Sequence, residues 1–401
     1  MSVRETIRLP RTQPRAPRQQ QPAKRPSLPN RVLQRVPAPE ILVSPAVIGW
    51  LTARLAIIGA LAFSRYLVNQ LGAADPAGRP SSGLLGWDAS WYVRIVSSGY
   101  ENLPWESMRF FPLLPTLSIA FRPLFGARFA ILLVVNGAAL ASGILLSPLA
   151  KEERGDDALA GRAGWLFALV PPAFVFAMGY AEALFVLCSI LTFLGLRRGR
   201  FGWAAAAGLL AGLSRPLGVL VAIPAIVESI RGWRRANRRE RVSRVLASLA
   251  PFGGMVSYLV WSGIRFGDPL RPFTVQQAFD RRGAFEDPIS SLLAAARQLL
   301  GGSDVGSGLH LPWALAFLAM LVLVFRRWPV SYGLFAGAIL VVALSAENLD
   351  SLERYGLSAF PLVLAAAELL RQPAIERVAA TLCGAGLVAY ATLAFLGAYV
   401  P

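Results

Sequence analysis

The chain has very few of the side chains that build metal centres and disulfide frameworks. Its 401 residues include a single histidine, His310, and two cysteines, Cys188 and Cys383. Both cysteines fall inside apolar runs, where a thiol usually behaves as a small hydrophobic side chain. We therefore expect no histidine-rich metal centre and no disulfide framework, and we expect His310 to be interfacial rather than catalytic. No metal ligands are assigned and no cofactor is expected, while a requirement for a divalent ion stays open.

Charged side chains, and acidic ones above all, are also scarce. They make up 16% of the chain against 55% hydrophobic residues, with 23 Asp and Glu beside 40 Lys and Arg. A chain this long and apolar does not fit one soluble core, so it predicts an all-α polytopic membrane protein. The basic residues lie in an N-terminal tail and in short loops between apolar runs, which is typical of membrane topology. We expect membrane lipids as partners and no nucleic acid.

Residues 1–43 are the first of two predicted regions. Residues 1–40 are rich in Arg, Pro and Gln, carry nine basic side chains and show no apolar periodicity, so we expect a disordered tail. The first apolar run covers residues 44–68. The basic stretch before it is too long for a cleavable signal peptide, so the run predicts an uncleaved membrane span. Its basic flank places the tail in the cytoplasm. Residues 44–401 are the predicted transmembrane domain.

The apolar runs predict about eleven membrane helices. Dense arginine clusters on the cytoplasmic side leave two large external loops, 71–127 and 265–309, which we expect to carry short interfacial helices. The pattern indicates a multi-pass protein of the plasma membrane. The approximate bounds of the expected helices are 44–68, 128–149, 162–178, 182–196, 201–213, 217–230, 245–264, 311–325, 329–345, 356–371 and 378–399.

The interval between Arg200 and Arg231 is too short for two full spans. Both residues belong to clusters that favour the cytoplasm, so about thirty residues must leave and return. We interpret 201–213 and 217–230 as two short helices that meet at Ser214-Arg215-Pro216-Leu217-Gly218. Backbone that reverses at this depth must be buried in protein or line a polar cavity, because lipid offers it no hydrogen bonds.

Asp88 is the acid of an aromatic segment in the first external loop. It follows Trp87 and precedes Trp91 and Tyr92 at helical spacing, so these aromatic side chains predict a short interfacial helix whose carboxylate faces a cavity. The alternative is an aromatic belt beside a solvated or helix-capping Asp88. Both interpretations fit this local pattern.

Prolines follow in the same loop. Arg109-Phe110-Phe111-Pro112, with Pro115 three residues later, predicts a rigid start for a second interfacial helix at about 113–125. A simple hinge between loop and membrane is compatible with the same residues.

Two arginines lie where a cation needs a partner. Arg215 sits at the helical reversal, and its candidate partners are Asp88, Glu182 or a ligand phosphate. Arg354 lies at the external mouth of the tenth helix, where its planar guanidinium is suited to clamp a phosphate. The alternative for Arg354 is a salt bridge to Glu353 or Asp350.

An apolar body, one candidate base and two such arginines suit a substrate with a lipid tail and a phosphate. Transfer of a sugar from a polyprenyl phosphate fits this description. The phosphate leaves without full protonation, so one carboxylate to activate the acceptor hydroxyl and cations to stabilise the departing charge suffice. A glycosidase would normally need a pair of carboxylates.

At this point the sequence resembles the PIG-V-like mannosyltransferases, which belong to the GT-C membrane glycosyltransferases. The resemblance extends from about residue 45 to 365. Its first cluster is fairly specific, and each weaker echo alone is not. The matching residues are Trp87-Asp88-x-x-Trp91-Tyr92, Ile95, Gly99-Tyr100 and Phe110-Phe111-Pro112-x-x-Pro115, with weaker echoes at Gly212-Leu-Ser-Arg215-Pro-x-Gly218, Gly267-Asp-Pro-Leu270, Arg354-Tyr355 and Phe360-Pro361.

The resemblance implies a GT-C-like helical body with a catalytic acid in its first external loop. It also implies a polyprenyl-phosphate sugar donor, with mannose as the expected sugar, an inverting transfer and a lipid or glycan acceptor. By the motif match Asp88 becomes the general base, and Arg215 and Arg354 become candidates for the donor phosphate. The full set of expected substrate-binding residues is Trp87, Trp91, Tyr92, Tyr100, Arg109, Arg215, Arg354 and Tyr355.

Two functions from other classes compete with this one. A transporter or flippase of lipid-linked sugar would perform no covalent chemistry, and it predicts charged residues along a path through the membrane core. A membrane scaffold would point Asp88 at lipid headgroups instead of a cavity. Convergence of Asp88, Arg215 and Arg354 on one cavity is the observation that separates these functions from a transferase.

Overall fold

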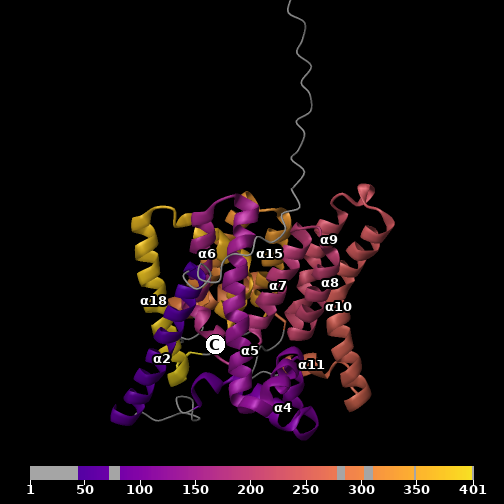
Figure 1. The fold of residues 1–401 in the computed structure, drawn as a ribbon. Helices are drawn as coiled ribbons and strands as arrows, with labels where there is room; N and C mark the ends of the chain where they lie inside the picture. The colour runs from indigo at the N-terminus through magenta and orange to yellow at the C-terminus, as the bar shows by residue number, and fades with distance from the viewer. Residues whose placement is uncertain (1–43, 72–81, 278–284, 302–309, 347–348, 400–401) are drawn as a thin grey trace, which may run out of the picture. The chain divides into compact units, whose positions relative to one another are not determined.

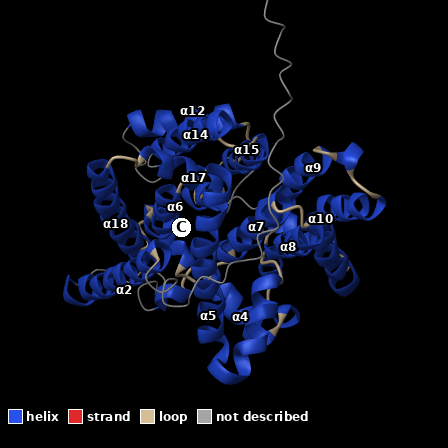
Figure 2. Cartoon of the chain, turned by 45° about the horizontal axis from the view of Figure 1, so that its top comes forward, coloured by secondary structure: helices blue, strands red, loops and turns tan. Residues whose placement is uncertain are grey.

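In the computed structural model, the residues described are 44–71, 82–277, 285–301, 310–346 and 349–399. They form helices and their connections, without a β-strand in these ranges (Figure 2). The predicted disordered tail, 1–43, lies outside them, as do residues 72–81 of the first predicted external loop and residues 278–284 and 302–309 of the second. The fold class is the predicted one, an all-α multi-pass membrane protein.

Each of the eleven predicted apolar segments is helical. Five helices are long and apolar enough to cross a membrane by length and composition, namely α2 (Pro45–Leu71), α5 (Leu113–Arg154), α10 (Arg238–Phe266), α14 (His310–Arg327) and α18 (Pro373–Leu396). The other six segments contain shorter helices, which are α6 (Asp157–Leu169), α7 (Glu182–Arg197), α8 (Phe201–Ser214), α9 (Ala222–Ile230), α15 (Val330–Leu344) and α17 (Phe360–Leu369).

The predicted loop regions also carry short helices. In the first, α4 (Asp88–Ser98) is followed by the one-turn helices η3 (Tyr100–Asn102) and η4 (Trp105–Arg109). In the second, α11 (Arg271–Thr274), η8 (Val275–Gln277) and α12 (Pro288–Gly301) are described. The connection before α17 forms α16 (Leu352–Ser358). The other short 3₁₀ helices, of one or two turns, are η2 (Gly83–Leu85), η5 (Pro171–Phe176), η6 (Pro216–Val221) and η7 (Trp233–Arg235).

Helix α5 joins the predicted interfacial helix at 113–125 to the span that follows. Its backbone leaves helical geometry at Gly126, where φ is 73° and ψ is 162°. Such a positive φ suits glycine, which has no Cβ to clash with the backbone. The kink lies at the predicted junction between the two helices.

The predicted reversal between α8 and α9 is present and packs against α10. Arg215 is extended at the turn, and η6 continues the chain into α9. Helices α8 and α10 approach at backbone distance, since a Cβ on Gly212 would lie 2.0 Å from the Pro251 carbonyl oxygen. The protein rather than lipid therefore covers this backbone, as the hydrogen-bonding argument requires.

Connections rich in lysine and arginine lie at one edge of the helical body, and the short helices of the first loop lie at the other edge. Figure 1 shows the α5–α6, α9–α10 and α17–α18 connections at its top edge, with α4 and α11 at the bottom. Lysine and arginine residues flank all three of the top connections. This arrangement agrees with the loop charges that guided the predicted topology.

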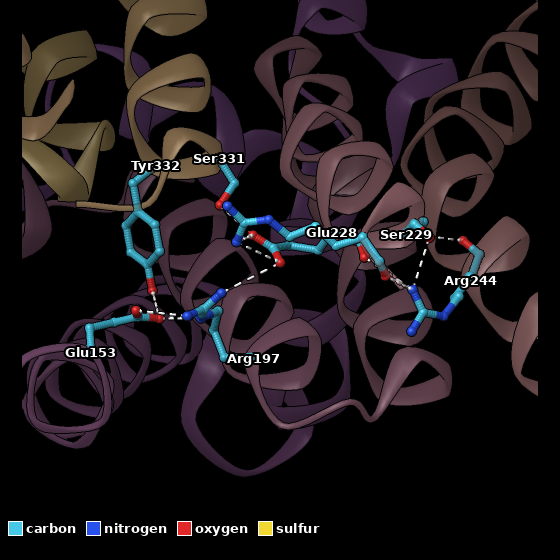
Figure 3. A network of polar contacts seen from close by, with 8 residues as sticks. Glu153, Arg197, Glu228, Ser229, Arg244, Ser331 and Tyr332 are labelled. Atoms are coloured by element: carbon cyan, nitrogen blue, oxygen red, sulfur yellow. Dashed lines mark hydrogen bonds and ion pairs between the residues drawn. The ribbon is translucent and has the colours of Figure 1, made fainter. Parts of the chain in front are cut away.

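A buried polar network joins helices near the cationic edge (Figure 3). Arg197 at the end of α7 pairs with Glu153 of α5 and lies 3.4 Å from Glu228 of α9. The Tyr332 hydroxyl donates to Glu153 over 3.0 Å, and the Ser331 hydroxyl donates to Glu228 over 2.8 Å. Because these carboxylates are at least nine-tenths buried, their partners offset the cost of removing them from water.

Candidate active site

A cavity of about 480 Å³ opens at the end of the helical body that carries α4. Its lining comes from segments far apart in the sequence, including α4, the start of α7, the α8–η6 reversal and α16. The lining residues are Trp87, Asp88, Tyr92, Arg109, Phe110, Tyr180, Ala181, Glu182, Arg215, Pro216, Leu217, Phe273, Gln276, Val342, Asp350, Ser351, Arg354 and Tyr355. The cavity therefore brings together Asp88, Arg215 and Arg354, the three residues that the sequence analysis singled out.

Asp88 is the first residue of α4, an amphipathic helix that buries Ala89, Tyr92 and Ile95 against the body. A carboxylate in the first helical turn is favoured by the partial positive charge of the helix N-terminus. Trp87 precedes it with φ 55° and ψ −133°, a backbone conformation that L-residues rarely adopt. The helix thus begins at a strained residue and presents the acid to the cavity.

Two arginines clamp the Asp88 carboxylate. The Arg109 Nη2 atom lies 2.9 Å from Oδ1, and the Arg354 Nη1 atom lies 2.9 Å from Oδ2. Burial of Asp88 raises its pKa, but the charges of Arg354 and Arg109 outweigh that effect and leave the pKa below its usual value. Asp88 is therefore ionised at neutral pH, with a separate guanidinium on each oxygen.

Glu182 extends this chain of charges to Arg215. Its Oε1 atom lies 3.2 Å from Nε of Arg354 and 2.8 Å from Nη1 of Arg215. Of the two acids named as candidate partners for Arg215, Glu182 makes the ion pair. The five residues alternate in charge in the order Arg109, Asp88, Arg354, Glu182 and Arg215.

The ring of Tyr355 lies beside Arg215, with the guanidinium carbon 5.0 Å from the ring centroid. The same carbon lies 6.0 Å from the ring centroid of Phe185 on α7. Such cation–π contacts hold a guanidinium by its face and leave its edges for other partners. Arg215 is therefore positioned by aromatic side chains as well as by Glu182.

Arg354 does not make the predicted alternative salt bridge to Glu353 or Asp350. Glu353 turns away from the cavity and accepts hydrogen bonds from His310 at 2.7 Å and from the Tyr399 hydroxyl at 2.8 Å. Asp350 lies 3.4 Å from His310 Nε2. His310, expected at an interface, is instead 2% exposed at the start of α14 and holds this segment in place.

Six of the eight expected substrate-binding residues line the cavity, and two do not. Trp91 stacks on Phe110 with ring centroids 5.9 Å apart, and Tyr100 donates a hydrogen bond to the Phe110 carbonyl oxygen over 2.6 Å. Both therefore support the cavity wall from behind. The six that line it are Trp87, Tyr92, Arg109, Arg215, Arg354 and Tyr355.

Several lining residues were not assigned to the site from the sequence. Glu182 was named only as a candidate partner, although an acid at the start of an apolar helix is a signal that a site could contain it. Tyr180, Phe273, Gln276 and Asp350 carry no comparable signal, since they lie in turns or short helices. Within the described ranges, His, Cys, Asp and Glu side chains do not form a group of three suited to a metal ion.

Comparison with solved structures shows the fold. ArnT from Cupriavidus metallidurans, solved with bound undecaprenyl phosphate, aligns with a TM-score of 0.50 at 18% identity, covering 73% of this chain and 57% of ArnT. The chain shares the helical fold of ArnT. An oligosaccharyltransferase from Archaeoglobus fulgidus, tethered to an acceptor peptide, aligns with a TM-score of 0.44 at 14% identity, covering 86% of this chain and 55% of that protein.

The chain thus spans little more than half the length of each of these solved proteins. Neither the family models nor the curated proteins give a match to the sequence. The ArnT likeness supports the GT-C-like fold expected from the sequence resemblance, while the PIG-V-like subfamily stays a prediction.

Proposed function

We propose that this protein is an integral-membrane glycosyltransferase that uses a polyprenyl-phosphate sugar donor. It transfers a hexose, with mannose as the expected sugar, to a lipid or glycan acceptor at the external face of the plasma membrane. The transfer inverts the anomeric centre, and Asp88 is the general base. The N-terminus lies in the cytoplasm.

The observation that carries the proposal is the convergence of Asp88, Arg215 and Arg354 on one cavity. They come from three separate helical segments, and the ion pairs through Glu182 connect them. A scaffold protein would have no use for a carboxylate and three arginines facing one partly enclosed space. A phosphate beside a base is the chemistry that such a set of charges suits.

The likeness to ArnT supports a lipid-phosphate donor, because that protein was solved with undecaprenyl phosphate. The donor phosphate would lie against Arg215 and Arg354, with Tyr355 beside them. The acceptor hydroxyl would approach Asp88 from the side lined by Trp87 and Tyr92, where aromatic faces suit a sugar ring.

The proposed reaction is a single displacement. The acceptor oxygen attacks the anomeric carbon, its proton passes to Asp88, and the bond from that carbon to the phosphate oxygen breaks with its electron pair on the phosphate. The arginines stabilise the negative charge that develops there, so no acid is needed to protonate the leaving group. Glu182 is engaged in ion pairs with Arg215 and Arg354, which does not suit the general acid of a glycosidase.

The test compares the wild type with Asp88→Asn, both purified intact and supplied with polyprenyl-phosphate mannose and membrane acceptors. Loss of the base is expected to lower turnover by about 10²- to 10⁴-fold. Glu101→Gln is the matched control, because Glu101 lies in the same loop but is half exposed and pairs with Arg265 away from the cavity. Turnover unchanged in Asp88→Asn would contradict the catalytic assignment, and movement of donor across vesicles without a covalent product would favour a flippase.

A further inference from the structure

Glu182 occupies a position between the two arginines proposed to bind phosphate. Its side chain is 5% exposed, and its Oε1 atom lies within ion-pair distance of both guanidinium groups. A carboxylate placed between two guanidinium groups holds them close to each other.

Two arginine nitrogens lie within ion-pair distance of Glu182. Nη1 of Arg215 and Nε of Arg354 are buried, and among the described residues neither makes a hydrogen bond of proper geometry, although both are within ion-pair distance of Glu182. Leaving such donors unsatisfied in a buried position is costly. These N–H groups have capacity for a further acceptor, and phosphate oxygens are suited to it.

Asp350 is the third acid of the cavity lining. It lies 3.4 Å from Nε2 of His310, whose other ring nitrogen contacts Glu353.

We propose that Glu182 is a positioning residue that controls when Asp88 becomes available as a base. It holds Arg215 and Arg354 side by side for the donor phosphate. When the phosphate binds, it and Glu182 together draw Arg354 away from Asp88, so that Oδ2 is released to the acceptor hydroxyl. This inference rests on the proposed function and adds an order to it, since the donor must bind before the base is free.

The ion pairs explain why such control is needed. In the structure each oxygen of Asp88 has a guanidinium 2.9 Å away, so one acceptor position of each oxygen is occupied before a hydroxyl group arrives. A base held in this way is also a weak one, because the charges that stabilise its ionised form disfavour the uptake of a proton. Transfer of Arg354 to the phosphate removes both obstacles in a single step.

Glu182→Gln tests the role, because it removes the charge and preserves the size of the side chain. Without the competing anion, undecaprenyl phosphate is expected to bind on the order of 10-fold more tightly, as titrated with the purified protein in detergent. With less pull on Arg354, Asp88 stays clamped, and kcat is expected to fall by about 10-fold or more. Tighter binding with slower turnover is not what a merely structural residue would give.

Glu182→Asp is the conservative variant, since it preserves the charge. It is expected to bind undecaprenyl phosphate within about twofold of the wild type, and it carries the test alone if Glu182→Gln does not fold. The inference is overturned if Glu182→Gln binds undecaprenyl phosphate more weakly than the wild type, or if its binding and turnover are both unchanged. It is also overturned if Glu182→Asp binds the lipid more than about fivefold more weakly.

The binding measurement and the turnover measurement test different statements, so one can fail without the other. If the wild type binds undecaprenyl phosphate but transfers no sugar from any polyprenyl-phosphate donor, the proposed function is wrong, and the affinity of Glu182→Gln still tests the placement of the phosphate. If the wild type transfers sugar and Glu182→Gln binds the lipid more weakly, only the role of Glu182 is wrong.

Discussion

Replacing Gly254 by alanine tests whether the packing of α10 sets the position of Arg215. Gly254 faces α8, and a Cβ at this position would lie 2.1 Å from the Leu209 carbonyl oxygen and 3.1 Å from the Leu213 amide nitrogen. These atoms belong to the backbone, so no side chain can rotate to make room. Helix α8 must therefore move away from α10, and Arg215 follows directly after its last residue.

The size of the effect follows from these distances. Real Cβ atoms do not approach a carbonyl oxygen closer than 3.0 Å, so α8 must shift by about 1 Å. Overpacking of this kind costs about 1–3 kcal/mol of stability. A displacement of about 1 Å in a substrate-positioning residue is worth up to about 100-fold in rate, so we expect kcat/KM for the donor to fall by about 10- to 100-fold.

The assay measures the melting temperature in detergent and kcat/KM for polyprenyl-phosphate mannose. Gly253→Ala is the matched control, because a Cβ there meets no atom within 4 Å and an alanine favours the same helix by up to about 1 kcal/mol. We expect the control to melt at or above the wild-type temperature with unchanged kinetics. A Gly254→Ala protein that melts lower but retains its kcat/KM would show that α8 packing does not position Arg215.

Two further predictions concern the buried network and the orientation in the membrane. Arg197→Met leaves Glu153 and Glu228 buried with one cation fewer, so we expect a loss of about 3 kcal/mol, measured as a lower melting temperature. Glu101→Cys, in a background free of native cysteines, is expected to react with an impermeant maleimide on intact cells, and Arg234→Cys only after the cells are opened.

Each of these has its own control. Arg198→Met removes the neighbouring arginine, which pairs with Glu152 at a partly exposed position, and it is expected to cost about 0–1 kcal/mol. Equal losses for Arg197→Met and Arg198→Met would mean that burial does not determine the strength of the network. Labelling of the residue-234 thiol on intact cells would reverse the proposed orientation.

The fold could be predicted from the sequence because each helix can be recognised from its own stretch of residues. An apolar run of known length, ended by arginines or by glycine and proline, is enough to place a membrane helix. Even the reversal at Arg215 followed from length and charge, since the interval was too short for two spans. The bounds were less accurate, and α10 begins at Arg238, several residues before the apolar run, because Asn237 caps it.

Asp88 and six other residues of the cavity lining could be predicted from the sequence, but only part of their pairing could. Asp88 and the arginines stand out because charge near a membrane is costly and aromatic side chains mark the interface. Glu182 was among the candidate partners of Arg215 and pairs with it. The partner of Arg354 did not follow, because it is an acid 266 positions away and not the adjacent Glu353. Trp91 belongs to the same motif as Tyr92, yet it packs behind the cavity, since residues one apart on a helix face different directions.

Trp87, the residue with strained backbone before Asp88, also contacts the last helix of the chain. The indole Nε1 of Trp87 donates a hydrogen bond over 3.0 Å to the carbonyl oxygen of Ala394, in the last turn of α18. No residue of α18 lines the cavity in the part of the chain that the structure describes. The residue before the acid is nevertheless anchored by the final helix. Because Ala394 lies 307 positions after Trp87, this hydrogen bond between the first loop and the last helix can form only after nearly the whole chain has been synthesised.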